Sequence, residues 1–117
     1  IVTANSGVNK IGLVEIGTLR ATHLLNNNNP VMLDVREPRE FTEVKVRDAL
    51  HLPLSQLKDR IDQVSKDKSR PVIVVDNKGM RGRGAGALLK KGGYNEIYML
   101  SGGLQAWRDA GLPVEKV

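Results

Sequence analysis

The segment PVIVV at residues 71–75 is the feature that most limits how this chain folds. After its proline it is an unbroken run of β-branched and aliphatic residues, typical of a strand buried on both faces of a parallel sheet. The run ends at Asp76, and a glycine-containing loop, NKGMRG at residues 77–82, follows. Residues 83–91 then have a helical pattern. A strand, a loop and a helix in this order predict part of a βαβ unit.

The rest of the chain repeats this alternation of apolar runs and segments with helical spacing. Strands and helices that alternate at these lengths predict an α/β fold around a largely parallel sheet. Gly84 and Gly86 within a helix predict close packing of that helix against the sheet. Pro38 is suited to the first turn of a helix at residues 37–44. The predicted strands cover residues 10–13, 31–33, 49–52, 71–75 and 96–100, and the other predicted helices cover residues 14–25, 54–64, 83–91 and 104–110.

The composition excludes several classes of function. The chain has 117 residues, which suits one domain, and no apolar run approaches the ~18–20 residues that span a bilayer. It contains no cysteine, which removes disulfides, thiolate metal sites and every mechanism with a cysteine nucleophile. One Trp, two Tyr and one Phe are too few for a base-stacking platform, so we expect no nucleic-acid partner. His23 and His51 lack other ligands at metal-binding spacing, so no metal or cofactor is expected.

The positive charge is concentrated in one part of the chain. The whole chain has a net charge of +5, and residues 71–95 account for +4 because Asp76 is their only acid. One interpretation is a solvated basic helix face. The other is a site for a small oxyanion or an acidic protein partner, because glycine-containing loops before helices direct N–H groups at anions. Duplex nucleic acid usually needs a larger basic footprint.

The loop that follows residue 75 is the expected site, because ligands of parallel sheets bind at the carboxyl ends of the strands. Two occupants remain open for its inward N–H groups. The Asp76 carboxylate folds in and caps the loop, or it points out and a small oxyanion binds with help from Lys78 and Arg81. We favour the first, since a tethered carboxylate loses no binding entropy. Met80 is expected to be exposed at the apex. The candidate residues are Asp76, Asn77, Lys78, Gly79, Met80, Arg81 and Gly82.

Five segments of the chain, taken together and in order, match a known pattern. They are VMLDVREPREF (31–41), ALHLPLSQL (49–57), PVIVVDNKGMRG (71–82), GGYNEIYMLSGGLQAW (92–107) and AGLPVE (110–115). They resemble the segments of a rhodanese-like domain, a sulfurtransferase fold. The resemblance implies a domain over residues 10–117 behind a flexible tail at residues 1–9, and three layers, with a mostly parallel five-stranded sheet between helices on both faces. It also implies a structural role for Asp34 and Arg36.

The loop departs from the family's pattern where sulfur chemistry takes place. In the family the loop begins with a cysteine that carries the transferred sulfur as a persulfide. Gly79 and Arg81 match the family pattern, but Asp76 stands at the cysteine position and Gly82 at a Ser/Thr position. A hard carboxylate oxygen forms no stable sulfur adduct, so we expect no sulfurtransferase turnover and a regulatory, anion-binding or partner-binding module. The alternatives are a residual or full-length-dependent sulfurtransferase activity and phosphoryl or acyl transfer by Asp76.

A bacterial subgroup of the family has a similar Val-Asp-x-x-Gly-Met loop and an N-terminal membrane helix. The chain begins at Ile1 rather than at a methionine. The resemblance therefore implies a cytoplasmic domain that a preceding segment tethers to the inner face of a membrane. Membrane contact is expected only through that segment.

Overall fold

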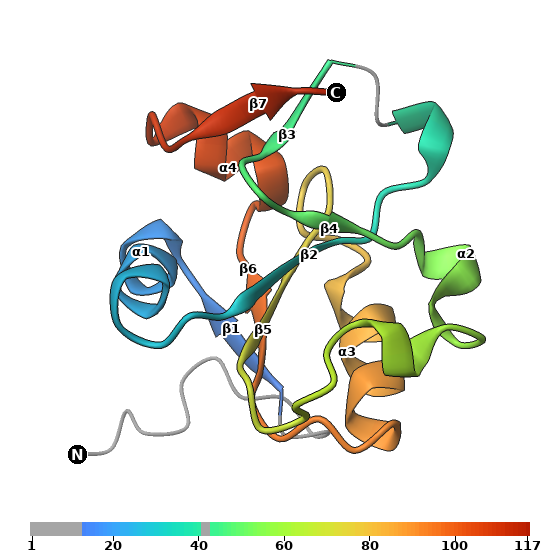
Figure 1. The fold of residues 1–117 in the computed structure, drawn as a ribbon. Coiled ribbons are helices and arrows are strands. Elements are labelled where there is room, and N and C mark those ends of the chain that lie inside the picture. Colours follow the sequence, from blue (N-terminus) through green and yellow to red (C-terminus); the bar gives the residue numbers. More distant parts are fainter. Residues whose placement is uncertain (1–12, 41–42) are drawn as a thin grey trace.

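The computed structural model of the chain describes residues 13–40 and 43–117, so the tail predicted at residues 1–9 lies outside it. Its centre is a five-stranded sheet in which every neighbouring pair of strands is parallel (Figure 1). This confirms the predicted α/β class. In spatial order the strands are β1 (Val14–Ile16), β6 (Ile97–Leu100), β5 (Val72–Val75), β2 (Val31–Asp34) and β4 (Leu50–His51).

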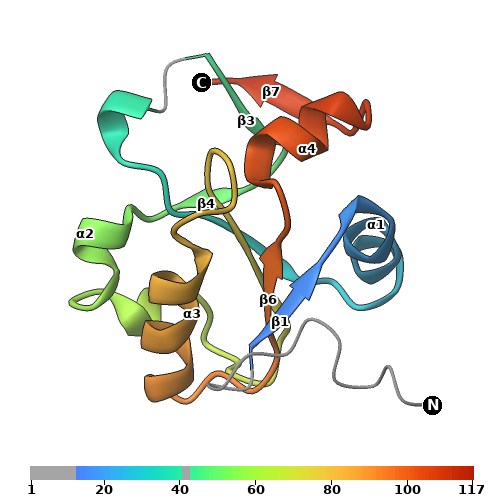
Figure 2. The same cartoon turned by 180° about the vertical axis from the view of Figure 1, so that it is seen from behind.

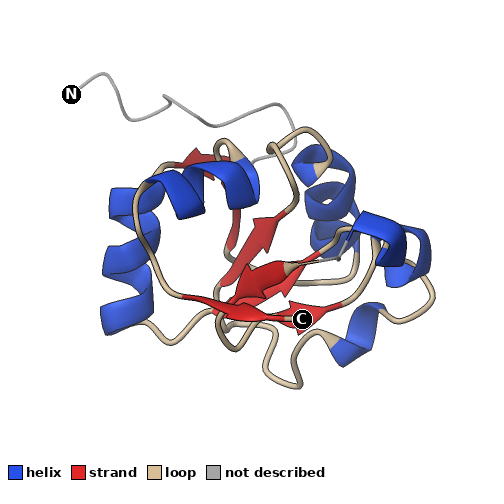
Figure 3. Cartoon of the chain, turned by 90° about the horizontal axis from the view of Figure 1, so that it is seen from above, coloured by secondary structure: helices blue, strands red, loops and turns tan. Residues whose placement is uncertain are grey.

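Helices cover both faces of the sheet, as the resemblance implied (Figures 1 and 2). On one face lie α1 (Thr18–Asn27) and α4 (Gly103–Asp109). On the other lie α2 (Leu54–Leu57) and α3 (Gly82–Lys91). Viewed from above, the strands run between these two helical layers (Figure 3). The three layers bury a separate apolar core on each side of the sheet.

Strand β5 shows why two cores form. Val72 and Val74 pack into the core beneath α3, while Ile73 and Val75 pack into the core beneath α4. All four side chains are at most 1% exposed. The uninterrupted apolar run is therefore buried on both faces, as predicted, because alternate side chains of a strand point to opposite faces.

The first strand and helix begin later than predicted. The helix predicted from residue 14 starts at Thr18, and Val14–Ile16 form edge strand β1 instead. Gly17, in an extended conformation, separates the two elements. The strand predicted at 10–13 lies outside the described residues except for Leu13, which is not in a strand. Pairing of β1 with β6 outweighs the helical spacing of the apolar residues here.

The helix predicted over residues 54–64 is broken into two short pieces. Only α2 is α-helical, and after a turn the 3₁₀ helix η3 (Ile61–Gln63) follows. The apolar residues at helical spacing still face one core, since Leu57 and Val64 are buried and Ile61 packs against them. Apolar spacing therefore predicted the buried face correctly but not the continuity of the helix.

A small second sheet was not predicted. Strand β3 (Val44–Val46) pairs in antiparallel fashion with β7 (Val114–Lys116) near the C-terminus. Of the helix predicted at residues 37–44, the described part contains only the 3₁₀ turn η2 (Pro38–Glu40), and Val44 belongs to β3. Three-residue strands are too short to show a periodic pattern in the sequence.

Of Gly84 and Gly86, the two glycines predicted to allow close packing of α3, only Gly86 is tightly packed, against the residue just before β1. A Cβ atom at Gly86 would lie 2.5 Å from Leu13 Cδ1, so no larger residue fits without rearrangement. At Gly84 the nearest atoms, from Leu54, are 3.8 Å away, which is ordinary contact. The prediction is therefore wrong for Gly84.

Candidate functional site

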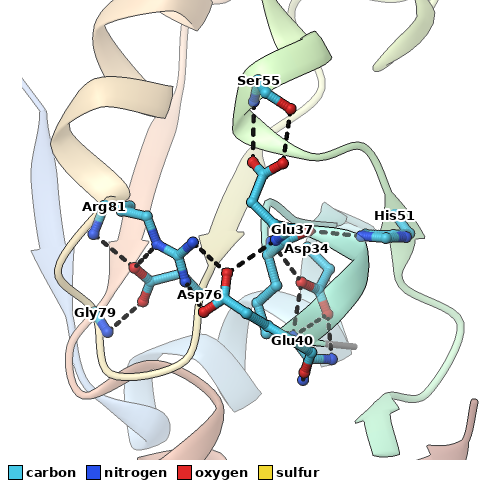
Figure 4. Close-up of polar contacts among 9 residues, drawn as sticks. Asp34, Glu37, Glu40, His51, Ser55, Asp76, Gly79 and Arg81 are labelled. Atoms are coloured by element: carbon cyan, nitrogen blue, oxygen red, sulfur yellow. Dashed lines mark hydrogen bonds and ion pairs between the residues drawn. The ribbon is translucent and has the colours of Figure 1, made fainter. Parts of the chain in front are cut away.

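Asp76 follows β5 at the carboxyl edge of the sheet, where its side chain turns into its own loop (Figure 4). The residue is only 2% exposed. Its Oδ1 accepts the Gly79 backbone N–H, and its Oδ2 accepts the Arg81 backbone N–H at 2.6 Å. The carboxylate therefore takes the place that a bound anion would need. Of the two occupants left open by the sequence, the structure contains the tethered one.

The loop is held in this shape by the turn before α4. Gly79 has φ +83°, and a Cβ atom there would lie 2.9 Å from the Gly102 nitrogen. Gly103 approaches so closely that a Cβ atom would overlap the Asp76 carbonyl oxygen at 2.3 Å. The Leu104 N–H donates to that same carbonyl at 2.7 Å. Only glycine allows two backbones to approach so closely, so this contact fixes the loop.

The Arg81 guanidinium interacts with two carboxylates. Its guanidinium donates through Nη1 and Nη2 to the two oxygens of Glu40, the second at 2.7 Å, and its Nε lies 3.5 Å from Asp76 Oδ2. The hydrogen bonds from Arg81 lower the pKa of Glu40 from its ordinary 4.5 to about 2. One of the two alternatives from the sequence had Arg81 assist a bound oxyanion, and no pairing of Arg81 with Glu40 was predicted. Instead these two side chains bind each other.

Glu40 is in turn positioned by a chain of contacts that reaches α2 (Figure 4). The Glu37 backbone N–H donates to Glu40 Oε1 at 3.0 Å across the turn η2. The Glu37 carboxylate accepts the Ser55 hydroxyl at 2.7 Å and the Ser55 N–H at 3.1 Å. These two bonds lower the pKa of Glu37. Glu40 and Arg81 are 41 positions apart in the sequence, so no local sequence pattern predicts their pairing.

Asp34 and Arg36 form a second, separate ion pair at the end of β2. Arg36 Nε donates to Asp34 Oδ1 at 3.0 Å, and Nη2 donates to Oδ2 at 2.8 Å. The same Nη2 donates to the Val44 carbonyl at 2.9 Å, which ties β3 to the main sheet. Both residues are buried, at 0% and 2% exposed. Arg36 Nη1 also lies 3.4 Å from the Glu40 carbonyl, so this buried pair sits beside the residue that holds Arg81.

The comparisons with known proteins agree with this architecture. The family model described as the rhodanese-like domain matches residues 20–110. The chain belongs to the rhodanese-like family. A relative named thiosulfate sulfurtransferase GlpE, from Actinobacillus succinogenes, is 33% identical over 105 residues, which cover 90% of this chain and 93% of the relative. An Escherichia coli relative, named uncharacterized protein YibN, is 29% identical over 115 residues, 97% of this chain and 79% of the relative.

Solved structures show the same fold. The crystal structure of the Anabaena protein Alr3790 superposes with a TM-score of 0.75 at 28% identity, over 87% of this chain and 92% of that one. A structure described as rhodanese with anions from E. coli gives a TM-score of 0.64 at 31% identity, over 75% of this chain and 99% of that one. The rhodanese-like domain described here differs from the family's loop pattern in having Asp76 at its start.

Three side chains of the loop of this rhodanese-like domain face solvent. Met80 is 83% exposed, as expected for the loop apex, and Asn77 and Lys78 are exposed beside it. Gly82 is buried, and a Cβ atom there would lie 3.3 Å from Met99. A shallow hollow of about 200 Å³ separates the loop from η2, and its lining residues are Glu40, Asp76, Asn77, Lys78, Met80 and Arg81.

Within residues 13–40 and 43–117, no three His, Asp or Glu side chains gather in a way that suits a metal ion. Over the same residues, no helix combines the length and the apolar character needed to cross a membrane.

Proposed function

We propose that this rhodanese-like domain is non-catalytic and serves as a regulatory binding module. The observation that carries the proposal is the buried Asp76 carboxylate, which accepts the N–H groups of Gly79 and Arg81. Sulfur transfer through a persulfide needs a thiolate at this position. A carboxylate offers no sulfur-accepting atom there, and the chain contains no cysteine to replace it.

The loop face supports binding of an acidic partner rather than a free oxyanion. A small oxyanion would have to displace a carboxylate that is already tethered, and Arg81 is held by Glu40. Lys78 precedes Met80 in the sequence and Arg83 follows it. Both are exposed, and neither forms an ion pair with any described residue. A loop that is already fixed loses little conformational entropy on binding. Methionine adapts its flexible side chain to apolar partners.

A transferase that uses Asp76 as its nucleophile has less support. Both carboxylate oxygens are engaged by loop N–H groups, and the side chain is 1% exposed. A nucleophilic oxygen has to reach its substrate, and this carboxylate is buried and turned into its own loop. The geometry favours a capping role for Asp76.

The test is an NMR titration of the ¹⁵N-labelled domain with a capped peptide that has a central Leu-Phe pair between acidic residues. We expect the amide shifts to include Lys78, Met80 and Arg83 and to weaken as salt is added, because exposed charges are screened. Lys78→Glu with Arg83→Glu should weaken this binding at least tenfold. Sulfate at millimolar concentration should leave the amides of residues 77–82 unmoved.

The matched control is Lys66→Glu with Lys90→Glu, which changes the net charge equally on exposed residues away from the loop. It should weaken binding at the loop by less than threefold. Equal loss in the two double variants, or peptide shifts that avoid the loop, would contradict the proposal. Loop shifts at submillimolar sulfate would instead show that the Asp76 cap is displaced by free anions.

A further inference from the structure

A second binding surface lies on the flank of the domain, between α3 and the segment containing α2 and η3. It is a groove of about 310 Å³, and its lining residues are Lys58, Ile61, Leu88, Lys91 and Gly92. The loop joins α3 at Gly82, whereas the groove lies at Lys91 and Gly92, where the helix ends. Ten helical residues span about 15 Å, so the two surfaces are distinct. We call this surface the α2–α3 groove.

The floor of the α2–α3 groove is apolar and fixed. Ile61 and Leu88 are partly buried and pack against the core beneath α3. Gly92 brings the end of the helix close to this floor, since a Cβ atom there would lie 2.7 Å from Ile61 Cγ1. A floor anchored to the core keeps its shape without a ligand, and this favours binding of a complementary apolar side chain.

Two unpaired ammonium groups flank this floor. Lys58 and Lys91 are both exposed, and neither forms an ion pair or side-chain hydrogen bond with any residue that the structure describes. Neighbouring Lys68 differs, because its Nζ lies 2.7 Å from Asp62 Oδ1 and donates to the Gly92 carbonyl at 2.7 Å. The groove itself has no acidic lining residue. An apolar floor between two cations is complementary to an apolar group between two anions.

We propose that the α2–α3 groove binds a segment of a partner protein in which a large apolar side chain is flanked by acidic side chains. The apolar side chain lies on Ile61 and Leu88, and the carboxylates face Lys58 and Lys91. A membrane surface fits less well, because a continuous layer of anionic headgroups would also meet exposed Asp59, the neighbour of Lys58 in the sequence. A short segment needs carboxylates only opposite Lys58 and Lys91. This proposal does not depend on the loop face binding anything.

The titration with the Leu-Phe acidic peptide also tests the groove. We expect shifts at the amides of Ile61, Leu88 and Gly92, and a peptide with serines in place of the Leu-Phe pair should lose most of them. Lys58→Glu and Lys91→Glu should each weaken binding at these amides at least fivefold. Lys90→Glu is the matched control, because Lys90 is exposed in the same helical turn but does not line the groove. It should change the affinity less than twofold.

Three results would overturn this proposal: no shifts at the groove amides, equal loss in Lys90→Glu, or undiminished binding of the serine peptide. Sedimentation with phosphatidylserine vesicles provides a further test. Vesicle binding that Lys58→Glu and Lys91→Glu abolish would assign the groove to a membrane instead. The variant with Lys78→Glu and Arg83→Glu should keep the groove shifts, so failure at the loop and failure at the groove are separately visible. Unchanged thermal unfolding confirms that each variant is folded.

Discussion

Two buried aspartates lie at the ends of the neighbouring strands β2 and β5, and their carboxylates accept hydrogen bonds from different kinds of donor. The strands pair in parallel, with Asp34 opposite Val75, so Asp34 and Asp76 lie at the same edge of the sheet. Asp34 accepts hydrogen bonds from the guanidinium of Arg36. Asp76 accepts two backbone N–H groups of its own loop. Asp34 also accepts the Arg36 backbone N–H, and Arg81 Nε lies 3.5 Å from Asp76. The shortest hydrogen bonds nevertheless come from a side chain at Asp34 and from the backbone at Asp76.

The two aspartates also differ in what their contacts hold together. Arg36 also donates to the Val44 carbonyl, so the pair at β2 fastens the main sheet to β3. The two hydrogen-bond donors to Asp76 are main-chain groups, and the loop that carries them is also held by the close backbone contacts of Gly79 and Gly103. Replacing Asp34 therefore disturbs a link between two sheets, whereas replacing Asp76 removes an acceptor within one loop.

Asp34→Ala is expected to have the largest effect on stability. It leaves the Arg36 guanidinium buried without its carboxylate, and breaking one side of a buried pair lowers the free energy of unfolding by about 3–5 kcal/mol. Urea unfolding followed by circular dichroism measures this loss. Replacing both partners, Asp34→Leu with Arg36→Met, should recover a substantial part of it. A loss below about 1 kcal/mol for Asp34→Ala would show that the pair does not anchor the fold.

Asp76→Ala is expected to have a smaller effect. It leaves the N–H groups of Gly79 and Arg81 without their acceptor, which lowers the free energy of unfolding by about 1–3 kcal/mol. Hydrogen exchange of these two amides should become faster, while amides of β5 exchange as before. Asp76→Asn, which keeps one acceptor oxygen, should fall between the wild type and the alanine variant. Destabilisation equal to that of Asp34→Ala would remove the distinction between the two aspartates.

Glu40→Gln is expected to have the smallest effect, and the effect depends on pH. Folding lowers the pKa of Glu40 from 4.5 to about 2, so its contribution is fully present above pH 4.5 and is lost as the pH falls through about 2. The pair with Arg81 is partly exposed, with side chains 24% and 30% accessible, so about 1 kcal/mol or less is expected at neutral pH.

Thermal unfolding of the wild type and of Glu40→Gln between neutral pH and about pH 2 measures this dependence. The difference in Tm between the two proteins should shrink across that range. Glu43→Gln, at an exposed neighbouring position, is the control and should show a smaller difference. A difference for Glu40→Gln that is independent of pH would mean that its pairing with Arg81 adds nothing to stability.

The sequence predicted those features that are encoded by continuous runs. The apolar run before Asp76 predicted a strand buried on both faces, and the loop residues after it predicted an inward cap. It did not predict that β3 would pair with β7, because that contact joins residues about seventy positions apart through strands of three residues. The Glu40–Arg81 pair was missed for the same reason, since partners distant in sequence leave no periodic signal.

The central claim, that this rhodanese-like domain has no sulfurtransferase turnover, is tested most directly by its thiosulfate:cyanide activity. In that reaction a thiolate attacks the sulfane sulfur, sulfite leaves, and cyanide removes the sulfur as thiocyanate. We expect the wild type and Asp76→Ala to release no thiocyanate above the uncatalysed rate. Asp76→Cys, which places a thiol beside the same loop N–H groups, should gain activity. Saturable thiocyanate release by the wild type that Asp76→Ala abolishes would contradict the account.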